Sequence, residues 1–575
     1  EIGSGLVGSE MCIRDRLYRQ FTITIAVSVL LSTVVALTLS PVMCSLILKP
    51  DNGKKKNIVF RKINEWLNLG NHKYVAVINR VIKNPRRLMS AFGLVLVAIF
   101  IIHRLVPTSF LPVEDQGYFK IELELPEGAT LERTRVVTDR AVQYLEKNPY
   151  VAYVQNVTGS SPRVGSNQAR SELTVILKPW EERKGISIDK IMENVEKDLK
   201  EYPECRVYLS TPPVIPGLGT SGGFEMQLEA RGEATFDNLV QAADTLMYYA
   251  QKHKELTGLS SSLQSEIPQL YFDVDRDKVK MLGVPLADVF STMKAYTGSV
   301  YVNDFNMFNR IYKVYIQAEA PYREHKDNIN LFFVKAKDGA MVPLTSLGNA
   351  SYTTGPGSIK RFNMFTTAVI RGSAAQGYSS GQAMEIMEQI ARDHLPDNIG
   401  LEWSGLSYQE KKAGGQTGLV LTLVFLFVFL FLAAQYESWT VPIAVLLSLP
   451  VAALGAYLGV VICGLENDIY FQIGLVMLVG LAAKNAILIV EFAKVQVDKG
   501  GDLIQSAIHA AQLRFRPILM TSLAFVLGML PMVLASGPGS ASRQAIGTGV
   551  FFGMIFAIVF GIVLVPFFFV LVYLS

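Results

Sequence analysis

The sequence has few residues of the kinds that form disulfide bridges or bind metals. Its 575 residues include six histidines and four cysteines, and the cysteines show no paired spacing and no C-x-x-C motif: Cys12, Cys44, Cys205 and Cys463. Neither a disulfide framework nor a zinc site is therefore indicated. A Walker motif is also lacking, so ATP is not the energy source. The Ser, His and acidic residues form no recognisable catalytic arrangement, and we expect no enzyme.

An excess of charge of either sign is lacking as well. The chain has 54 Lys or Arg against 50 Asp or Glu, a net charge of +4 that carries no nucleic-acid signature. Half of the residues are hydrophobic and the mean hydropathy is +0.29, which is too apolar for a string of soluble domains. The composition indicates an α-helical polytopic membrane protein.

Seven apolar segments are long enough to cross a bilayer. We predict spans over residues 17–48 and 88–106, and five more within 418–575, at 418–434, 441–462, 469–492, 517–535 and 546–573. Residues 49–87 hold eleven Lys or Arg, which places this loop in the cytoplasm. Residues 1–16 fit neither a signal peptide nor the span that follows, and they are interpreted as a non-native leader.

The basic loop also contains a helix-like apolar face. Its residues are Ile58, Val59, Phe60, Ile63, Trp66 and Leu67. A cationic segment with one apolar face is typical of a helix that lies along the membrane surface.

About 310 residues between the second and third spans form a predicted α+β extracytoplasmic domain. Strand-like and helix-like segments alternate as βαββαβ over 107–222, the order of a ferredoxin-like unit. A second unit begins in 223–262 and resumes in 356–417. The insert at 263–355 is a candidate for contact with a partner or another subunit.

Lys484 is the residue that most needs an explanation. It lies inside an uncharged run, ten residues from the next cation, Lys494, which is roughly 15 Å along a helix and beyond the reach of a lysine side chain. Such a charge costs at least a few kcal/mol in hydrocarbon, so we expect either a functional role or a structural ion pair between helices. Lys494 and Glu491 are closer to the inner membrane surface, and we interpret them as solvated residues that flank the span.

The next span supplies possible partners. Thr521 is close to the depth of Lys484 and lies seven residues, roughly 10 Å, above Arg514, so the three side chains could meet in one layer. Arg514 can also be a positive-inside arginine beside Arg516, and Thr521 can be bonded back to its own helix. Asn485 either orients the Lys484 side chain or has only a packing role. No Asp or Glu lies in a predicted span at the depth of Lys484, so its carboxylate partner must be elsewhere.

Several stretches resemble resistance-nodulation-division efflux pumps of the AcrB, hydrophobe/amphiphile type. They are GLAAKNAILIVEFAK, RFRPILMTSLAFVLGMLP, YESWTVP, NDIYFQIGL, TSFLPVEDQG and SVYVNDF. The resemblance covers nearly everything from residue 17 to 575 and corresponds to the second half of such a pump, from its sixth transmembrane helix onward. It implies drug/proton antiport by a homotrimer in the inner membrane of a Gram-negative bacterium.

The resemblance also assigns roles. Lys484, Arg514 and Thr521 match the family's proton-relay lysine, arginine and threonine, with Asn485 in support, and the acidic partners would be an aspartate pair on a helix outside this chain. The βαβ units would be porter subdomains, and 263–355 would be part of a docking domain. The expected partners are amphiphilic substrates, membrane lipid, a periplasmic adaptor and an outer-membrane channel. A proton gradient and no cofactor would drive transport.

The presumed substrate cleft departs from drug-exporting relatives. Where those relatives often carry phenylalanines, this chain has polar residues, with Gln155, Ser160, Arg163 and Thr174 as candidate cleft residues. An aromatic-poor cleft binds flat apolar drugs less well. A heavy-metal exporter would need clustered methionines, yet 107–224 contains only Met192. A non-transporting scaffold, or an inactive truncated chain, is the remaining alternative.

Overall fold

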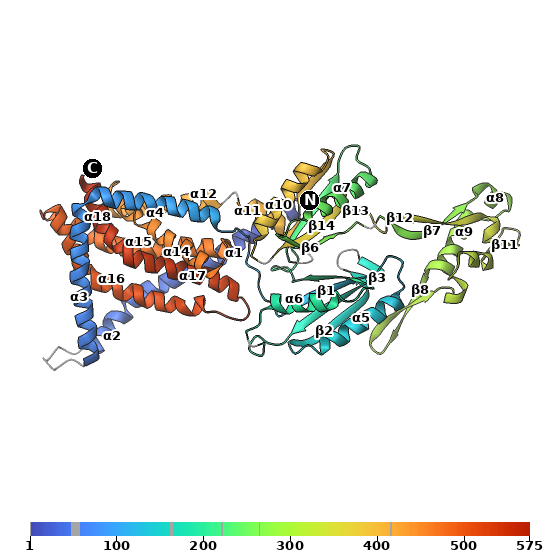
Figure 1. Ribbon diagram of the computed structural model, residues 1–575, viewed down its shortest axis with the longest axis horizontal. Coiled ribbons are helices and arrows are strands. Elements are labelled where there is room, and N and C mark those ends of the chain that lie inside the picture. Colours follow the sequence, from blue (N-terminus) through green and yellow to red (C-terminus); the bar gives the residue numbers. More distant parts are fainter. Residues whose placement is uncertain are drawn as a thin grey trace.

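Three parts follow one another along the long axis of the molecule: a helical bundle, two units built on β-sheets, and a small distal lobe (Figure 1). The computed structural model describes residues 2–47, 58–161, 165–183, 185–219, 222–263, 265–375, 377–414 and 417–574. It describes no side chain for residues 2–18, 58–60, 63, 413, 414, 417 and 419.

Within the described residues, six helical segments are long and apolar enough to cross a membrane: Arg19–Ile47, Pro85–Leu105, Val441–Cys463, Ile469–Asp498, Leu503–Val533 and Ser540–Leu574. A shorter apolar helix covers Val420–Tyr436. The corresponding elements are α1 (Ile2–Leu37), α2 (Leu39–Ile47), α4 (Pro85–Leu105), α12 (Thr417–Tyr436), α13 (Val441–Leu446), α14 (Leu449–Cys463), α15 (Ile469–Asp498), α16 (Leu503–Val533), α17 (Ser540–Phe556) and α18 (Ile562–Leu574).

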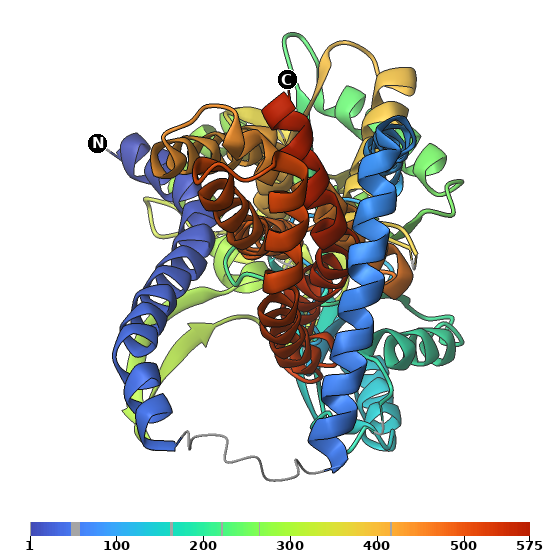
Figure 2. The ribbon, with the colours of Figure 1, turned by 90° about the vertical axis from the view of Figure 1, so that its left-hand side faces the viewer.

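Small residues let the central helices approach closely. A Cβ added to Gly455 or Gly459 on α14 would lie 2.6 Å from Phe556 or Phe552 on the α17 side, and one added to Gly553 would lie 2.3 Å from Leu478 on α15. Close backbone approach at small residues is typical of packed membrane helices. In contrast, most of α1 lies apart from the other helices (Figure 2), and the apolar window of its span has no buried residue. Its Phe21 contacts the Tyr470 ring edge-on at 5.9 Å.

The predicted spans 469–492 and 517–535 lie largely within two longer helices. α15 continues to Asp498 and α16 begins at Leu503, where the Asp502 carboxylate accepts a hydrogen bond from the Gln505 N–H at 3.0 Å. The predicted membrane span begins at Pro517, where hydropathy rises, and the helix that contains it begins earlier. Residues before Pro517 remain helical because one face packs into the bundle core, with Ala507, Ala510 and Ala511 fully buried.

The basic loop contains α3 (Ile58–Lys83), which crosses the end of the bundle (Figures 1 and 2). Tyr74 stacks on Phe515 of α16 at 4.8 Å and donates a hydrogen bond to the Ile562 carbonyl at 3.0 Å. The side chain of Trp66 is 63% exposed. One face of α3 is therefore packed against the bundle, and an apolar side chain remains free on another.

The first sheet unit comprises β1 (Tyr118–Glu124), α5 (Leu131–Glu146), β2 (Val151–Ser161), β3 (Gly165–Leu177), α6 (Ile188–Leu199) and β4 (Arg206–Ser210). Its antiparallel sheet has the order β2-β3-β1-β4. Thr130 and Ser187 cap the two helices with side-chain oxygens. Alternate strand residues such as Phe119, Ile121 and Leu173 form the core beneath the helices, which leaves the other face of the sheet without a helical cover.

The second unit comprises β5 (Phe224–Ala230), α7 (Phe236–Ala250), β6 (Leu256–Ser261), β13 (Lys360–Phe362), β14 (Phe365–Ala374), α10 (Ser380–His394) and β15 (Ile399–Trp403). The strand order is β13-β14-β5-β15, and β6 also pairs with β14. The sequence analysis assigned neither β6 nor β15. α11 (Gly405–Gly414) then leads back to the bundle.

The segment between the halves of this unit extends away from the bundle. β7 (Ile267–Val274) and β12 (Gly348–Gly355) pair along their whole length and form a two-stranded stem. The distal lobe beyond it holds α8 (Arg276–Met281), α9 (Leu286–Met293), β8 (Val300–Met307), β9 (Arg310–Ile316), β10 (Phe333–Lys335) and β11 (Met341–Pro343). Its core includes the fully buried Val289, Leu344 and Leu347.

Candidate functional site

Lys484 lies on an exposed stripe of α15. The opposite side of this helix is buried in the bundle core, including Ala483, Ala486 and Val490. Gly480, Lys484 and Glu491 are exposed at helical spacing. Among the residues that the structure describes, Lys484 forms no ion pair and no side-chain hydrogen bond. The ammonium therefore faces out of this bundle at a depth where hydrocarbon would be unfavourable.

Asn485 fixes the depth of the lysine relative to α16. Its amide Nδ2 donates a hydrogen bond to Ser522 Oγ at 3.0 Å, and both residues are buried. Because Lys484 and Thr521 are the sequence neighbours of this pair, they lie at one level of the bundle. The sequence analysis missed Ser522, although its position beside Thr521 is a usable signal once the two helices are aligned by depth.

Thr521 and Arg514 are not joined to Lys484 by any contact. Thr521 Oγ1 donates to the carbonyls of Pro517 and Ile518 at 3.0 and 3.1 Å, the backbone-bonded arrangement that the sequence left open. The Arg514 guanidinium lies 5.1 Å from the ring centre of Phe492, two turns below Lys484 on α15, and its buried Nε has no hydrogen-bond partner. The single layer of three side chains is therefore not formed here, and the relay roles remain predictions.

The other charges near the inner end have local partners or are exposed. Lys494 Nζ donates to the Tyr436 carbonyl at 2.5 Å, where it caps the C-terminus of α12. Arg516 Nη2 donates to Asn68 Oδ1 of α3 at 3.0 Å. Lys484 differs from these cations because it faces out of the bundle far from the surface.

The outer end of α15 is joined to the sheet units through residues 107–115, which we call the joint segment. Thr108 pairs with Asn467 in an isolated parallel bridge, and the Asn467 N–H donates to the Pro107 carbonyl at 2.8 Å. Further along, Glu114 accepts hydrogen bonds from the N–H and hydroxyl of Ser542 on α17, at 2.9 and 2.5 Å. Two membrane helices are thus fastened to the chain that leads into β1.

Three carboxylates lie around this joint. Burial raises the pKa of Glu410 and of Asp468 to about 7, and it also raises the pKa of Glu466. Glu410 accepts a hydrogen bond from Ser380 at the start of α10 at 2.7 Å, which partly opposes the effect of burial, and the nearby Glu466 adds to it. Asp468 caps α15 by accepting from the Phe471 N–H at 2.7 Å. The sequence analysis missed all three carboxylates.

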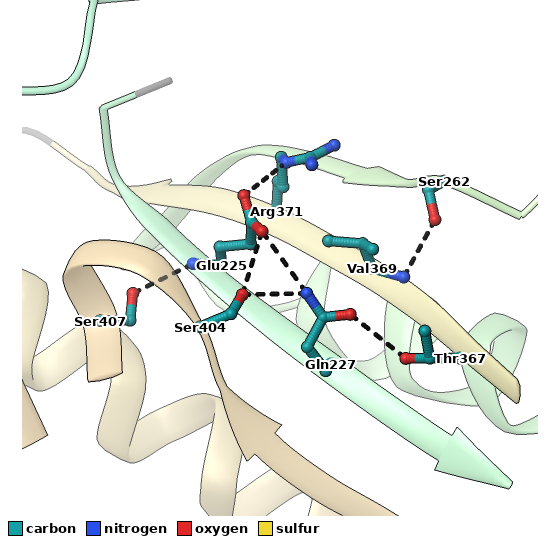
Figure 3. A network of polar contacts seen from close by, with 8 residues as sticks. All are labelled: Glu225, Gln227, Ser262, Thr367, Val369, Arg371, Ser404 and Ser407. Carbon is teal, nitrogen blue, oxygen red and sulfur yellow. Dashed lines mark hydrogen bonds and ion pairs between the residues drawn. The ribbon is translucent and has the colours of Figure 1, made fainter. Parts of the chain in front are cut away.

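The helix α11 is fixed to the second sheet by a polar network (Figure 3). Glu225 accepts from Arg371 Nε and from Ser404 Oγ, each at 3.0 Å, and Gln227 Nε2 donates to Ser404 Oγ at 2.9 Å. Further bonds join Thr367 to Gln227, the Glu225 N–H to Ser407 Oγ, and the Val369 N–H to Ser262 Oγ. The network therefore ties the central strands to the segment that returns to the membrane.

The predicted cleft residues lie on the helix-free face of the first sheet. Gln155 on β2 is directly opposite Thr174 on β3, and Ser160 is opposite Ser166 at the end of the same hairpin. Lys120 of β1 is the neighbour of Thr174 on its other side, and its ammonium contacts Glu172 at 2.6 Å. Arg163 lies outside the described residues. The structure thus brings Gln155 and Thr174 together but leaves their role as cleft residues untested.

Comparison with known protein sequences assigns the chain to a family. The sequence model of the AcrB/AcrD/AcrF family matches residues 11–573. The chain is 38% identical over 563 residues to the multidrug/solvent efflux pump membrane transporter MepB of Pseudomonas putida, and equally to the multidrug resistance protein MdtF of Escherichia coli K12. It is 37% identical over 565 residues to the multidrug export protein AcrF of the same organism.

These alignments cover 97% of this chain but only 53% or 54% of each relative. The chain therefore spans about half the length of the curated relatives it matches.

Proposed function

Because the chain belongs to the AcrB/AcrD/AcrF family, we propose that it forms half of a proton-driven exporter of amphiphilic small molecules. The observation that carries this proposal is the exposed Lys484, held at a fixed depth by the buried Asn485–Ser522 hydrogen bond. A cation facing out of the bundle at this depth requires a covering surface that carries a carboxylate. The described residues supply none, so the partner belongs to the remainder of the protein.

The relay would work by making and breaking one charge pair in a low dielectric. With its partner carboxylates ionised, Lys484 pairs with them. When they take up protons from the periplasmic side, the lysine loses its attraction and turns toward Thr521, which lies at the same level. Thr521 Oγ1 can accept a hydrogen bond from the ammonium while its hydroxyl still donates to a backbone carbonyl. Arg514, two turns lower, would hold a positive charge near the inner exit.

Movement of α15 would reach the sheets through its outer end. Asp468 caps α15 and Asn467 pairs with the joint segment, so the two residues connect α15 to the chain that leads into β1. The contact between Glu410 and Ser380 connects α11 to α10 of the second unit. A shift of α15 therefore changes the relative position of the two units, as a transport cycle with alternating access needs.

We assign the remaining parts by the same family membership. Seven transmembrane helices hold the protein in the inner membrane, the two sheet units are ferredoxin-like porter subdomains, and the stem with its distal lobe belongs to a docking domain. The working form is a trimer with a periplasmic adaptor and an outer-membrane channel. Substrate contacts the helix-free face of the first sheet, with Gln155, Ser160, Arg163 and Thr174 as the lining residues.

The test is transport by the full-length protein in lipid vesicles under an imposed proton gradient. Lys484→Ala is expected to abolish the accumulation of a fluorescent amphiphile, because one side of the charge pair is lost. Lys499→Ala, at the end of α15, removes a cation of the same type near the surface and serves as the matched control. Unchanged transport in Lys484→Ala would overturn the relay assignment.

A further inference from the structure

A cavity of about 590 Å³ lies where the outer end of α4 meets the first turns of α10. One wall is formed by the last turns of α4 and the segment after it, and the other by α10. Its lining includes Phe100, His103, Arg104, Thr108, Gly381 and Glu385. The cavity lies away from Lys484 and from the cleft residues, so the proposed function does not use it.

The wall of the cavity that α4 forms is continuous with an exposed apolar surface along the same helix. Along α4, the exposed fractions of Val97, Phe100, Ile101 and Leu105 are 58%, 62%, 51% and 71%. Phe100 and Leu105 also line the cavity. α4 is long and apolar enough to cross the membrane, so we expect its last turn, with Arg104, at the level of the lipid headgroups, where its exposed apolar side chains offer a surface for acyl chains.

The two walls contribute opposite charges that are not used by the protein. Arg104 comes from α4 and Glu385 from α10, and among the described residues neither forms an ion pair with the other or with any other side chain. The guanidinium of Arg104 lies 5.5 Å from the ring centre of Phe100, one turn earlier on the same helix. Both side chains are exposed, so a cation and an anion, each without an ion-pair partner among the described residues, line one cavity from opposite sides.

The other polar groups of the lining already have partners. His103 Nδ1 is 3.1 Å from the Tyr457 hydroxyl, and the Gln382 side chain accepts a hydrogen bond from the Ser379 N–H at 3.0 Å in the cap of α10. The Gly381 N–H donates to the Thr108 carbonyl at 3.3 Å. The charge of Arg104 and the charge of Glu385 therefore decide which ligand the cavity selects.

We propose that this cavity binds the headgroup of a zwitterionic bilayer phospholipid that carries a primary ammonium. Arg104 binds the phosphate, Glu385 accepts hydrogen bonds from the ammonium, and the acyl chains lie along Phe100 and Ile101 on α4. Charge-assisted hydrogen bonds of this kind are the strong ones. A lipid with a net negative headgroup places its excess charge against Glu385, and a purely cationic amphiphile is repelled by Arg104.

The test measures lipid retention by the full-length protein by native mass spectrometry after it is taken from vesicles of defined composition. The vesicles contain phosphatidylethanolamine in competition with either phosphatidylglycerol or phosphatidylcholine. Wild type is expected to retain phosphatidylethanolamine in preference to both. Glu385→Gln is expected to weaken its retention about tenfold, the equivalent of one charge-assisted hydrogen bond. It should also remove most of the preference over phosphatidylcholine, whose ammonium has no N–H to donate.

Arg104→Gln is expected to weaken retention of all three phospholipids, because each has a phosphate. Arg87→Gln, at the opposite end of α4, removes an exposed cation far from the cavity and is the matched control. Thermal unfolding in detergent checks that the variants are folded. Equal retention of phosphatidylglycerol by wild type, or retention by Glu385→Gln that matches wild type, would overturn the proposal.

Discussion

The two sheet units differ in what they do with the face that their helices leave open. In the first sheet part of this face is accessible: on β2, Tyr153 is 73% exposed and Gln155 beside it is also exposed, whereas Glu122 on β1 and Arg170 on β3 are buried. In the second sheet the corresponding face is buried and cross-linked, with Gln227 and Thr367 at 5% and 3% exposure. Similar elements therefore produce one surface that is free to meet a ligand and one that is fixed to α11.

The difference arises from which residues alternate with the core positions. In β5 and β14 the residues opposite the core are Glu225, Gln227, Thr367 and Arg371, whose donors and acceptors satisfy one another (Figure 3). Polar groups can be buried when they are hydrogen-bonded in this way. The first sheet also buries polar groups on this face, where Arg170 pairs with Glu122 and Glu124 at 3.1 and 2.9 Å, but Tyr153, Gln155 and Ile176 lie outside that cluster and remain exposed. We infer that the second unit transmits movement as a rigid body, whereas the first offers a binding surface.

The largest expected effect is the loss of the second sheet's network. Arg371→Ala leaves the carboxylate of Glu225 largely buried without its cation, and we expect a loss of about 3 kcal/mol in the free energy of unfolding. Arg140→Ala removes an exposed ion pair with Glu204 in the first unit and should cost about 1 kcal/mol or less. Chemical denaturation of both variants of the full-length protein compares them. Equal losses would contradict the claim that the Glu225 carboxylate depends on a buried network.

A smaller effect on stability is expected from the Glu410 carboxyl, which lies where α11 meets α10 of the second unit. The pKa of Glu410 is raised from 4.5 to about 7, so the folded protein binds the proton more tightly than the unfolded chain does. The resulting stabilisation is fully present below pH 4.5 and is lost as the pH rises through about 7, on the order of 2 kcal/mol. Thermal unfolding of wild type should therefore occur at lower temperature at pH 8 than at pH 5.5.

Glu410→Gln should make this pH dependence shallower, because the amide does not titrate. Asp393→Asn, which changes an exposed carboxyl on α10, is the matched control and should leave the pH dependence as it is in wild type. A pH dependence in Glu410→Gln as steep as that of wild type would show that this carboxyl does not titrate in the joint.

The smallest effect on stability is expected on the open face of the first sheet. Gln155→Phe replaces an exposed side chain on a strand and should change the free energy of unfolding by about 0.5 kcal/mol or less. The added ring should increase export of flat aromatic drugs relative to polar amphiphiles in the vesicle assay. Asp393→Phe, which places the same ring at an exposed position on α10, is the control. Export ratios that do not change would remove Gln155 from the substrate surface.

Much of the fold follows from local patterns in the sequence. The alternation of Phe119, Ile121 and Leu123 is enough to predict the strand β1. The long apolar runs are enough to predict the membrane segments. The short strands β6 and β15 carry too few alternating residues to be recognised, and they form only because β14 and β5 provide edges for them. Hydropathy did not reveal that the helix of the span at 517–535 begins at Leu503, because packing keeps 503–516 helical.

The site was predictable to the extent that it depends on depth along a helix. Counting residues placed Lys484 and Thr521 at one level, and the hydrogen bond from Asn485 to Ser522 agrees with that level. The same counting cannot show which way a side chain points, so it missed the exposure of Lys484 and the packing of Arg514 on Phe492. The joint around Glu410 and Asp468 joins segments far apart in the chain, and local patterns do not reveal it.

The most direct test of the account is the coupling of substrate movement to proton movement at Lys484. In vesicles that contain the full-length protein and a pH-sensitive dye, addition of an exported amphiphile should speed the collapse of an imposed pH gradient. Lys484→Met, which keeps the length of the side chain without its charge, should show no such acceleration, whereas Lys499→Met should behave as wild type. Acceleration in Lys484→Met equal to that of wild type would contradict the central claim that this exposed lysine is one side of the proton switch.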